Sequence, residues 1–408
     1  MRYRDDSAMK TTSSRTATTG TNAEHSRQHN RRVILEAIRL AGRLTRADLT
    51  RLTSLTAQTV SNIVSELQGE GMLLAHPPEK GGRGQPAVPL SIDPEGGFSI
   101  GFHVEQHCII GVLLNLSGET LDQATLTVSY PTFAQALPLI LQVIADFRRQ
   151  RPNGRFIGTG IALPGPFNVE GISSVGPTAL SGWDAPDIAQ SLESQAGMPV
   201  LIENDATCAA MGERLHGLAS EVQNFVHLFI GSGLGAGMYL GNRLYAGHWH
   251  NAGEIGHMTV IANGKACSCG NHGCLERYIS IAALMEHLGR DTDQSLSAQD
   301  MQDPQVNAAI DSWLDEAAPA LRQAINILES LLDPQTILIS GFLPEALLTC
   351  LLTRLEPLSR SISSRADRQY PRVQLGSAGP DAVAVGAAAL MILAQISPDY
   401  EALLKRPL

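Results

Sequence analysis

Three of the six cysteines fall within eight residues, in the segment Cys267-Ser-Cys269-Gly-Asn-His-Gly-Cys274. Thiolates are soft ligands that zinc prefers, and a structural zinc site takes four ligands, thiolates or imidazoles, in a tetrahedron. Glycines at 270 and 273 allow so short a segment to wrap one ion. Free core cysteines are not expected in a polar, glycine-rich loop. The segment therefore predicts a structural zinc ion without an open coordination position.

The sequence offers several histidines as the fourth ligand. His257 ends the segment Gly253-Glu254-Ile-Gly-His257, His272 lies inside the cysteine segment, and His248 and His250 lie a few residues upstream. Ligand chemistry alone does not choose among them.

The elements at the amino-terminal end have the pattern of a DNA-binding domain. A helical apolar pattern begins near Arg31, Thr45-Arg-Ala-Asp48 has the form of a capping box before a helix through Leu52, and Thr56 can cap a third helix. The apolar stripe of the third helix consists of Val60, Ile63, Val64 and Leu67, and its polar side includes Gln58, Thr59, Ser61 and Asn62. This pattern predicts a helix-turn-helix whose polar side reads DNA. An ordinary small helical bundle with a solvated face is the alternative.

Two short apolar runs, 73–76 and 87–92, flank the segment Lys80-Gly-Gly-Arg-Gly-Gln-Pro86. Paired as strands, they would form a winged helix whose tip carries Arg83 between glycines, able to enter a minor groove. A flexible linker is the alternative for this loop. The segment 93–97 then supplies a domain boundary.

From residue 98 onward, apolar runs of strand length alternate with amphipathic helical stretches, which predicts an α/β body in two lobes. The expected strands are 99–104, 108–114, 156–163, 199–202, 225–230 and 336–339, and the expected helices include 133–149, 206–216 and 306–332. The predicted domains are a disordered tail (1–28), a winged helix-turn-helix (29–95) and the two-lobed body (96–408).

Charge and hydropathy narrow the class of protein. Residues 1–90 contain 13 Lys and Arg against 8 Asp and Glu, although the whole chain has a net charge of −10. A basic front on an acidic body suggests an anionic partner for the front. The longest uncharged apolar stretch, 382–394, is shorter than a bilayer span, and no secretory signal is visible. We therefore expect a soluble, cytoplasmic protein with no membrane partner.

The sequence from about 31 to 393 resembles the ROK family of repressors and sugar kinases. Four ordered segments carry the resemblance: 203–213 (Glu-Asn-Asp-Ala-Thr-Cys-Ala-Ala-Met-Gly-Glu), 231–237 (Gly-Ser-Gly-Leu-Gly-Ala-Gly), 247–257 and 267–276. The resemblance implies an actin-like or hexokinase-like pair of lobes around a sugar cleft. It also implies zinc bound by His257, Cys267, Cys269 and Cys274.

The same resemblance assigns the sugar contacts. It implies that the sugar pocket contains Asn204, Asp205, Glu254, His257 and Glu276, residue types that hydrogen-bond adjacent hydroxyls. If zinc takes one nitrogen of His257, the other can face the sugar. In the family's kinases the residue matching Asp205 is the general base. Read alone, Asp205 is better explained as the cap of the helix 206–216.

The phosphate-binding half departs from the kinase pattern. Where the kinases have Asp-x-Gly-Gly-Thr, this chain has His103-Val-Glu-Gln-His107, so Glu105 would repel polyphosphate. Phe342 stands where the kinases usually have a glycine pair near adenosine. Gly231 to Gly237 could still supply backbone N–H groups to a phosphate. We therefore expect no productive ATP binding and no catalytic residues.

The sequence favours a sugar-responsive regulator, most simply a repressor, that binds operator DNA as a homodimer. An ATP-dependent sugar kinase with an appended DNA-binding domain is the first alternative, and a zinc-stapled dimerisation scaffold without a sugar ligand is the second. Ala179 replaces the usual Asn of the family's sugar loop, which leaves the identity of the sugar open.

Overall fold

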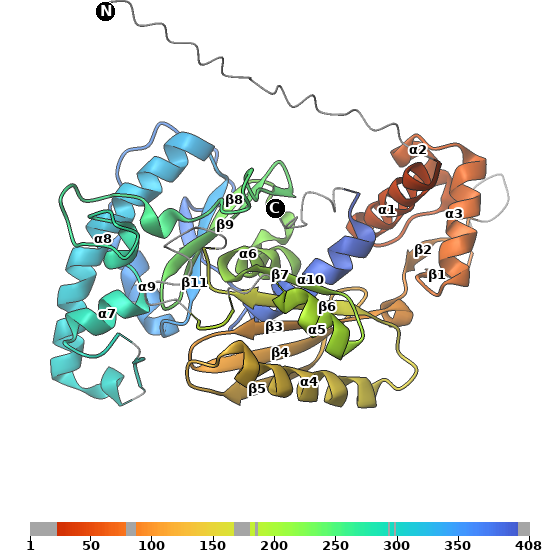
Figure 1. Ribbon diagram of the computed structural model, residues 1–408. Helices are drawn as coiled ribbons and strands as arrows, with labels where there is room; N and C mark the ends of the chain where they lie inside the picture. The colour runs from red at the N-terminus through yellow and green to blue at the C-terminus, as the bar shows by residue number, and fades with distance from the viewer. Residues whose placement is uncertain are drawn as a thin grey trace, which may run out of the picture.

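A computed structural model describes residues 23–78, 87–166, 180–183, 187–292, 294–297 and 299–398. Arg83 at the predicted wing tip, Ala179 in the predicted sugar loop and most of the predicted tail lie outside the described residues. Figure 1 shows a small head at one end of the molecule and two larger lobes beside it.

The head contains three helices and a two-stranded antiparallel sheet, in the order that the sequence predicts (Figure 1). Its elements are α1 (Ala23–Ala41), α2 (Arg46–Thr53), α3 (Ala57–Gly69), β1 (Leu73–Ala75) and β2 (Leu90–Ile92). The predicted capping box is present, since Thr45 and Asp48 each bond to the other's backbone N–H. The expected onset of order near Arg31 is wrong, because α1 begins eight residues earlier, at Ala23.

The first lobe, described from residue 98, contains a five-stranded sheet in the order β5-β4-β3-β6-β7. Its strands are β3 (Phe98–Val104), β4 (Cys108–Asn115), β5 (Thr120–Thr127), β6 (Phe156–Leu163) and β7 (Val200–Asn204). Its helices are α4 (Phe133–Gln150) and α5 (Ile188–Ala196), and α6 (Asp205–His216) follows β7.

The second lobe repeats this arrangement, with the sheet order β10-β9-β8-β11-β12. Its strands are β8 (Phe225–Ile230), β9 (Leu234–Leu240), β10 (Arg243–Leu244), β11 (Thr336–Gly341) and β12 (Val373–Leu375). Its helices are α7 (Ile281–His287), α8 (Pro304–Leu332) and α9 (Glu345–Arg354), whereas α10 (Ala382–Ile396), which follows β12 in the chain, packs on the sheet of the first lobe. Short 3-10 helices are η1 (Pro94–Gly96), η2 (Leu218–Glu221), η3 (Ile255–His257), η4 (Leu275–Arg277) and η5 (Asp300–Gln302). In each sheet, taken in the order given, the first three strands pair antiparallel with one another. The third, fourth and fifth strands pair parallel, so the two lobes share one topology.

The predicted phosphate turn at Gly231 to Gly237 is only partly a turn. β9 begins at Leu234, so Gly235 and Gly237 are strand residues. A Cβ at Gly237 would lie 2.4 Å from the Cβ of Ala210 and 2.6 Å from the carbonyl oxygen of Ala206. These glycines therefore let β9 pack closely on α6.

Helix α10 packs against α6 and against β3 and β6. Glycines make these contacts close: a Cβ at Gly160 would lie 1.8 Å from the carbonyl oxygen of Ala387. The uncharged apolar stretch noted in the sequence is thus a buried core helix. Among the described residues, no helix combines the length and the apolar character required to cross a bilayer.

The head and the body share one hydrophobic core. Ile34 and Ile38 of α1, Val64 of α3 and Ile392 and Ile396 of α10 belong to a single buried cluster. Figure 1 shows α10 running from between the lobes to the head. The head is therefore held by apolar packing as well as by the chain connection.

The junction between head and body also contains a cavity of about 510 Å³. Glu36 and Arg39 line it from α1, Arg214 lines it from α6, and Leu393 lines it from α10. The cavity therefore lies between α1 of the head and the helices α6 and α10 of the body.

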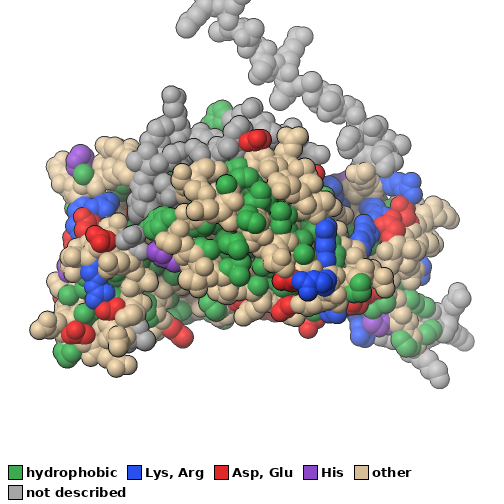
Figure 2. Space-filling model, turned by 60° about the horizontal axis from the view of Figure 1, so that its bottom comes forward, with side chains coloured by type: hydrophobic (Ala, Val, Ile, Leu, Met, Phe, Trp, Pro, Cys, Tyr) green, Lys and Arg blue, Asp and Glu red, His purple; other side chains and the backbone are tan. Residues whose placement is uncertain are grey.

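Several basic side chains of the head are paired with acidic ones. Arg27 and Arg31 of α1 form ion pairs with Glu66 and Glu70 at the end of α3. Figure 2 shows blue and red side chains next to one another at this end of the molecule, on the right of the view. Some of the basic side chains of the head therefore stabilise the packing of α1 on α3.

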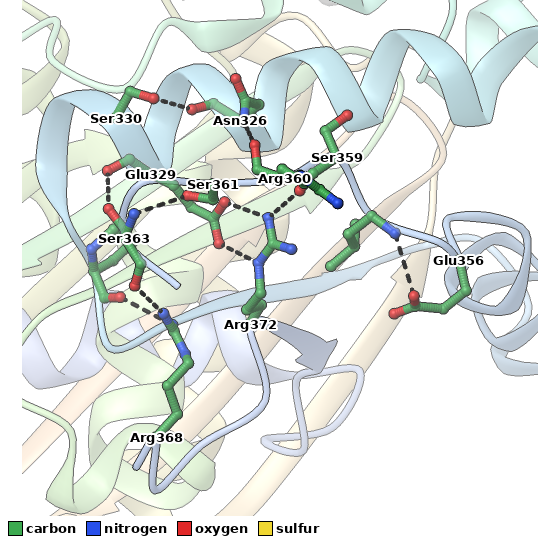
Figure 3. A network of polar contacts seen from close by, with 12 residues as sticks. Asn326, Glu329, Ser330, Glu356, Ser359, Arg360, Ser361, Ser363, Arg368 and Arg372 are labelled. Carbon is green, nitrogen blue, oxygen red and sulfur yellow. Dashed lines mark hydrogen bonds and ion pairs between the residues drawn. The ribbon is translucent and has the colours of Figure 1, made fainter. Parts of the chain in front are cut away.

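A polar network fastens the segment after α9 to α8 (Figure 3). Glu329, only 1% exposed, forms a bidentate ion pair with Arg372, with N–O distances of 2.8 and 2.6 Å. Ser363 donates to the carbonyl oxygen of Glu329 at 2.9 Å. These contacts hold the segment between α9 and β12 against α8.

Candidate functional site

The junction of β7 and α6 presents two polar side chains. Asn204 is the N-cap of α6, and its side-chain oxygen accepts from the Thr207 N–H at 3.1 Å. Asp205 is the first helical residue, and its Oδ1 accepts from the Ala206 N–H at 2.6 Å. The interpretation of Asp205 as the helix cap is therefore wrong by one residue, and its carboxylate lines the adjacent cavity.

Gly165 brings side chains of two separate segments together. A Cβ at this position would lie 2.6 Å from Asn204 Nδ2 and 2.9 Å from Glu254 Oε1. Both polar groups thus contact the bare backbone of a turn that follows β6. A larger residue at 165 would displace at least one of them.

The segment that carries Glu254 and His257 is pressed onto β9. The Ala236 N–H donates to the carbonyl oxygen of Gly253 at 2.8 Å, and Gly253 has a φ of +100°. A Cβ at Gly256 would lie 2.3 Å from the carbonyl oxygen of Leu234. Both glycines are therefore required for this close approach, which fixes the two functional side chains.

Glu276 reaches the same place from η4. It is 7% exposed, and its Oε2 accepts from the Leu234 N–H at 3.4 Å. Burial raises the pKa of this carboxyl above its ordinary value.

One cavity brings together all five side chains that the resemblance assigns to a sugar pocket. They come from three segments that are far apart in the sequence: Asn204, Asp205, Glu254, His257 and Glu276. Phe229 and Leu234 add apolar surface. Three of the five are carboxylates, and no Lys or Arg lines this cavity in the described parts of the chain.

The carboxylates affect one another. Burial raises the pKa of Asp205 well above its ordinary value, and the charges of Glu105 and Glu254 raise it further. Burial likewise raises the pKa of Glu105. An acceptor-rich cavity of this kind is stabilised by a partner that brings hydrogen-bond donors or positive charge.

His257 and the three cysteines form a compact cluster. One ligand atom from each of the four lies within 4.8 Å of the others, and Cys269 Sγ and Cys274 Sγ are 3.7 Å apart. Sulfur atoms bound tetrahedrally at about 2.3 Å from one ion lie about 3.8 Å apart. The cluster is therefore a metal-binding candidate whose spacing fits a tetrahedral ion.

The structure also chooses among the histidines. His257 Nδ1 lies 3.6 Å from Cys267 Sγ, which leaves its other nitrogen for the neighbouring cavity. His272 is exposed, and the ring of His248 lies against Trp249. Of the described histidines, only His257 lies in this cluster.

The turn between β3 and β4 contacts the turn between β8 and β9. The Ser232 hydroxyl donates to Gln106 Oε1 at 2.8 Å and lies 3.4 Å from Glu105 Oε2. These are the two turns that the resemblance relates to phosphate binding. Here they bond to each other, with a buried carboxylate between them.

Phe342 lies beside this contact. Its ring stacks on His103, with centroids 5.4 Å apart and planes 6° apart, and meets Phe229 edge-on at 5.6 Å. The two aromatic rings and the imidazole therefore fill space behind the turns.

The polar side of α3 is accessible in part. Gln58 and Asn62 are exposed, and Gln58 Nε2 donates to Asn62 Oδ1 at 2.8 Å. Thr59 and Ser61 are half-buried. The two exposed amides are one helical turn apart and lie on the same side of α3.

Sequence reasoning missed several contributors to these contacts. Gly165, Phe229 and Ser232 line or bridge the cleft, and none was predicted. The run Pro164-Gly165-Pro166 directly after a buried strand was the available signal for a special turn.

The family model described as ROK family matches residues 99–394. The chain belongs to the ROK family. A solved ROK family transcriptional regulator, titled a homolog of the E. coli MLC protein, has a TM-score of 0.72 and 25% identity, covering 93% of this chain and 98% of that one. This coverage includes residues ahead of the family match, where the head lies.

A repressor and a glucokinase are also similar to this chain. The xylose repressor of Bacillus subtilis (strain 168) is 33% identical over 276 residues, which are 67% of this chain and 71% of that protein. A ROK family glucokinase from Streptomyces griseus, solved with glucose and AMPPNP, has a TM-score of 0.58 at 24% identity, over 72% of this chain and 99% of that one. Its likeness shows that the fold is shared.

Proposed function

We propose that this ROK protein is a sugar-responsive transcriptional repressor, whose head binds operator DNA and whose body binds a free sugar. One observation carries the proposal. Five side chains that can hydrogen-bond to hydroxyls line one cavity of the body, and the body shares its hydrophobic core with the helix-turn-helix head. The similarity to a xylose repressor and to a ROK transcriptional regulator supports it.

The chemistry of the cavity favours a neutral polyol. Asp205, Glu254 and Glu276 are acceptors when ionised, and sugar hydroxyls supply donors to them. A sugar phosphate would bring a second set of negative charges into a buried cavity that no described Lys or Arg lines. The effector is therefore a free sugar, and D-xylose is the first to test because of the similarity to the xylose repressor.

The zinc ion proposed for His257, Cys267, Cys269 and Cys274 has a positioning role. It supplies no open coordination site when four protein ligands bind it. It would fix the ring of His257 and the ends of the two segments that carry Glu254 and Glu276.

A continuous path of packed elements joins the sugar cavity to the head. Asp205 begins α6, α6 packs on α10, and α10 packs on α1. A sugar that binds one lobe arrangement better than the other would shift α10 and thereby the angle of the head. The cavity at the junction gives that motion room.

We further propose that the protein acts as a cytoplasmic homodimer. A single recognition helix reads only a few base pairs, whereas two related by a two-fold axis read a palindrome with half-sites a whole number of turns apart. Gln58, Thr59, Ser61 and Asn62 of α3 face the bases in this arrangement, with Arg83 in the adjacent minor groove.

The body does not act as a kinase in this proposal. Ser232 of the facing turn bonds to Gln106 and lies 3.4 Å from Glu105, so the two turns already contact each other where polyphosphate would lie. Phe342, stacked on His103, occupies space near the expected nucleotide side. The remaining kinase-like feature is Asp205, the would-be general base.

The test is an operator titration by fluorescence anisotropy, with the upstream DNA of the gene and of its neighbours as probes. We expect a palindromic probe whose Kd changes at least about tenfold with one free sugar and not with that sugar's phosphate. The same protein is assayed for ADP release with each sugar. Sugar-dependent turnover that disappears in Asp205→Asn would establish the kinase, and failure of every sugar to bind in calorimetry would leave only a scaffold.

Replacing Asn62 by alanine should relax base preference at one position of the half-site. The exposed amide is suited to a bidentate contact with adenine, and losing it costs about 1 to 3 kcal/mol against the preferred base. Competition among probes with single-base changes measures this. Gln142→Ala, an exposed amide on α4, is the matched control, and equal effects of both variants would remove α3 as the reading helix.

A further inference from the structure

A second group of potential metal ligands lies apart from the cysteine cluster. His103 at the end of β3, Glu105 in the following turn and Asp205 at the start of α6 each offer one ligand atom, all within 4.8 Å of one another. Two of these positions are ones where the chain departs from the kinase pattern. None of the three was predicted as a metal ligand from the sequence.

His103 is fully buried, and neither of its ring nitrogens has a hydrogen-bond partner among the described residues. Phe342 stacks on one face of the ring, and Phe229 meets it edge-on at 6.1 Å. A neutral imidazole always carries one N–H donor and one lone pair. Burying both without a hydrogen-bond partner or a bound ligand destabilises the folded protein.

The carboxylates of Glu105 and Asp205 also lack a cationic partner among the described residues. Glu105 is 5% exposed, and Asp205 lines the sugar cavity. Neither forms an ion pair with any residue that the structure describes. Buried carboxylates without a cation are stabilised by a bound metal ion or by protons.

We propose that His103, Glu105 and Asp205 bind one divalent transition-metal ion, of the Mn²⁺, Co²⁺, Ni²⁺ or Zn²⁺ class. One imidazole with two carboxylates matches this class, whereas Mg²⁺ and Ca²⁺ prefer oxygen ligands alone. Ligand atoms at about 2.1 Å from one ion lie about 3 to 4 Å apart, so small side-chain movements close the site. Three protein ligands would leave coordination positions open, and Asp205 also lines the cavity described above.

The consequence for the ligand rests on the proposed function. Two vicinal hydroxyls of a sugar can fill two open positions of such an ion, which would make the sugar a ligand of the metal as well as of the protein. The metal site itself does not depend on this step.

Manganese titration tests the site in the full-length protein without sugar or DNA. Brief dialysis against EDTA is followed by metal analysis, which must find the zinc of the cysteine cluster retained. Mn²⁺ binding is then followed by electron paramagnetic resonance, because Mn²⁺ prefers oxygen and nitrogen ligands to thiolates. We expect one Mn²⁺ per chain.

Two variants remove ligands in different ways. His103→Phe keeps an aromatic ring beside Phe342, and Glu105→Gln keeps the side-chain shape. Each should weaken Mn²⁺ binding at least about tenfold, whereas Glu193→Gln, an exposed carboxylate on α5, should not. Retained zinc and an unchanged circular dichroism spectrum show that each variant is folded.

The absence of Mn²⁺ binding in the wild-type protein would overturn the proposal and leave protonated carboxylates as the explanation. Equal Mn²⁺ affinity in the wild-type protein and both ligand variants would also overturn it, because the ion would then bind elsewhere. Since no sugar or DNA is present, either result is independent of the operator titration.

Discussion

Cys267→Ser is expected to lose both the zinc ion and the response to sugar. Structural zinc sites with thiolate ligands contribute on the order of 10 kcal/mol to the order of the segments that they join. Here those segments carry His257, Glu254 and Glu276, three of the five side chains in the proposed sugar cavity. Metal analysis should fall from one zinc per chain to near zero, and the sugar Kd in calorimetry should rise at least about 100-fold.

The control for this prediction is Cys350→Ser. Cys350 is an exposed cysteine on α9, away from the cluster, so its replacement should change neither zinc content nor sugar affinity. A Cys267→Ser protein that keeps its zinc would contradict the ligand assignment. One that loses zinc but binds sugar as before would contradict the positioning role.

The sequence contained enough local information to predict the head. Thr45 and Thr56 are helix caps, and the stripe from Val60 to Leu67 is the buried face of α3. Capping and apolar periodicity act within one or two turns, so they are visible without tertiary contacts. The paired strands β1 and β2 were likewise predicted on both sides of the segment 80–86.

The elements that sequence reasoning missed are those whose character depends on their neighbours. β9 contains Gly235 and Gly237, which weaken a strand pattern, and these glycines are explained only by the contact of β9 with α6. The repeated topology of the lobes was not predicted either, because similar sheets can form from dissimilar residues.

The sequence predicted the residues of the cavity but not the arrangement around Glu105. Family resemblance identified the five side chains of the cavity, and the structure brings them together. It could not reveal that Glu105 lies near Asp205 and Ser232, because these residues belong to different segments that only the packing of the two lobes unites. The sequence therefore predicted a charge that repels nucleotide but not the group of three potential ligands around it.

Glu254→Gln should separate sugar sensing from DNA binding. Glu254 lies beside Asn204 at the edge of Gly165, on the segment pressed onto β9, and it lines the cavity without belonging to the shared core of head and body. A carboxylate that accepts from two sugar hydroxyls contributes about 3 kcal/mol, since hydrogen bonds to charged groups are the stronger ones. The amide keeps the shape but presents one acceptor oxygen, so the sugar Kd should rise about 100-fold.

The operator Kd measured without sugar should stay within about twofold of the wild-type value, because the head is untouched. Glu221→Gln, an exposed carboxylate in η2, is the matched control and should leave both constants unchanged. The two constants are measured on the same preparations, by calorimetry for the sugar and by anisotropy for the operator. If Glu254→Gln weakened operator binding in the absence of sugar as much as it weakened sugar binding, the cavity would belong to the DNA-binding state itself. The path through α6 and α10 would then not be a switch that sugar operates.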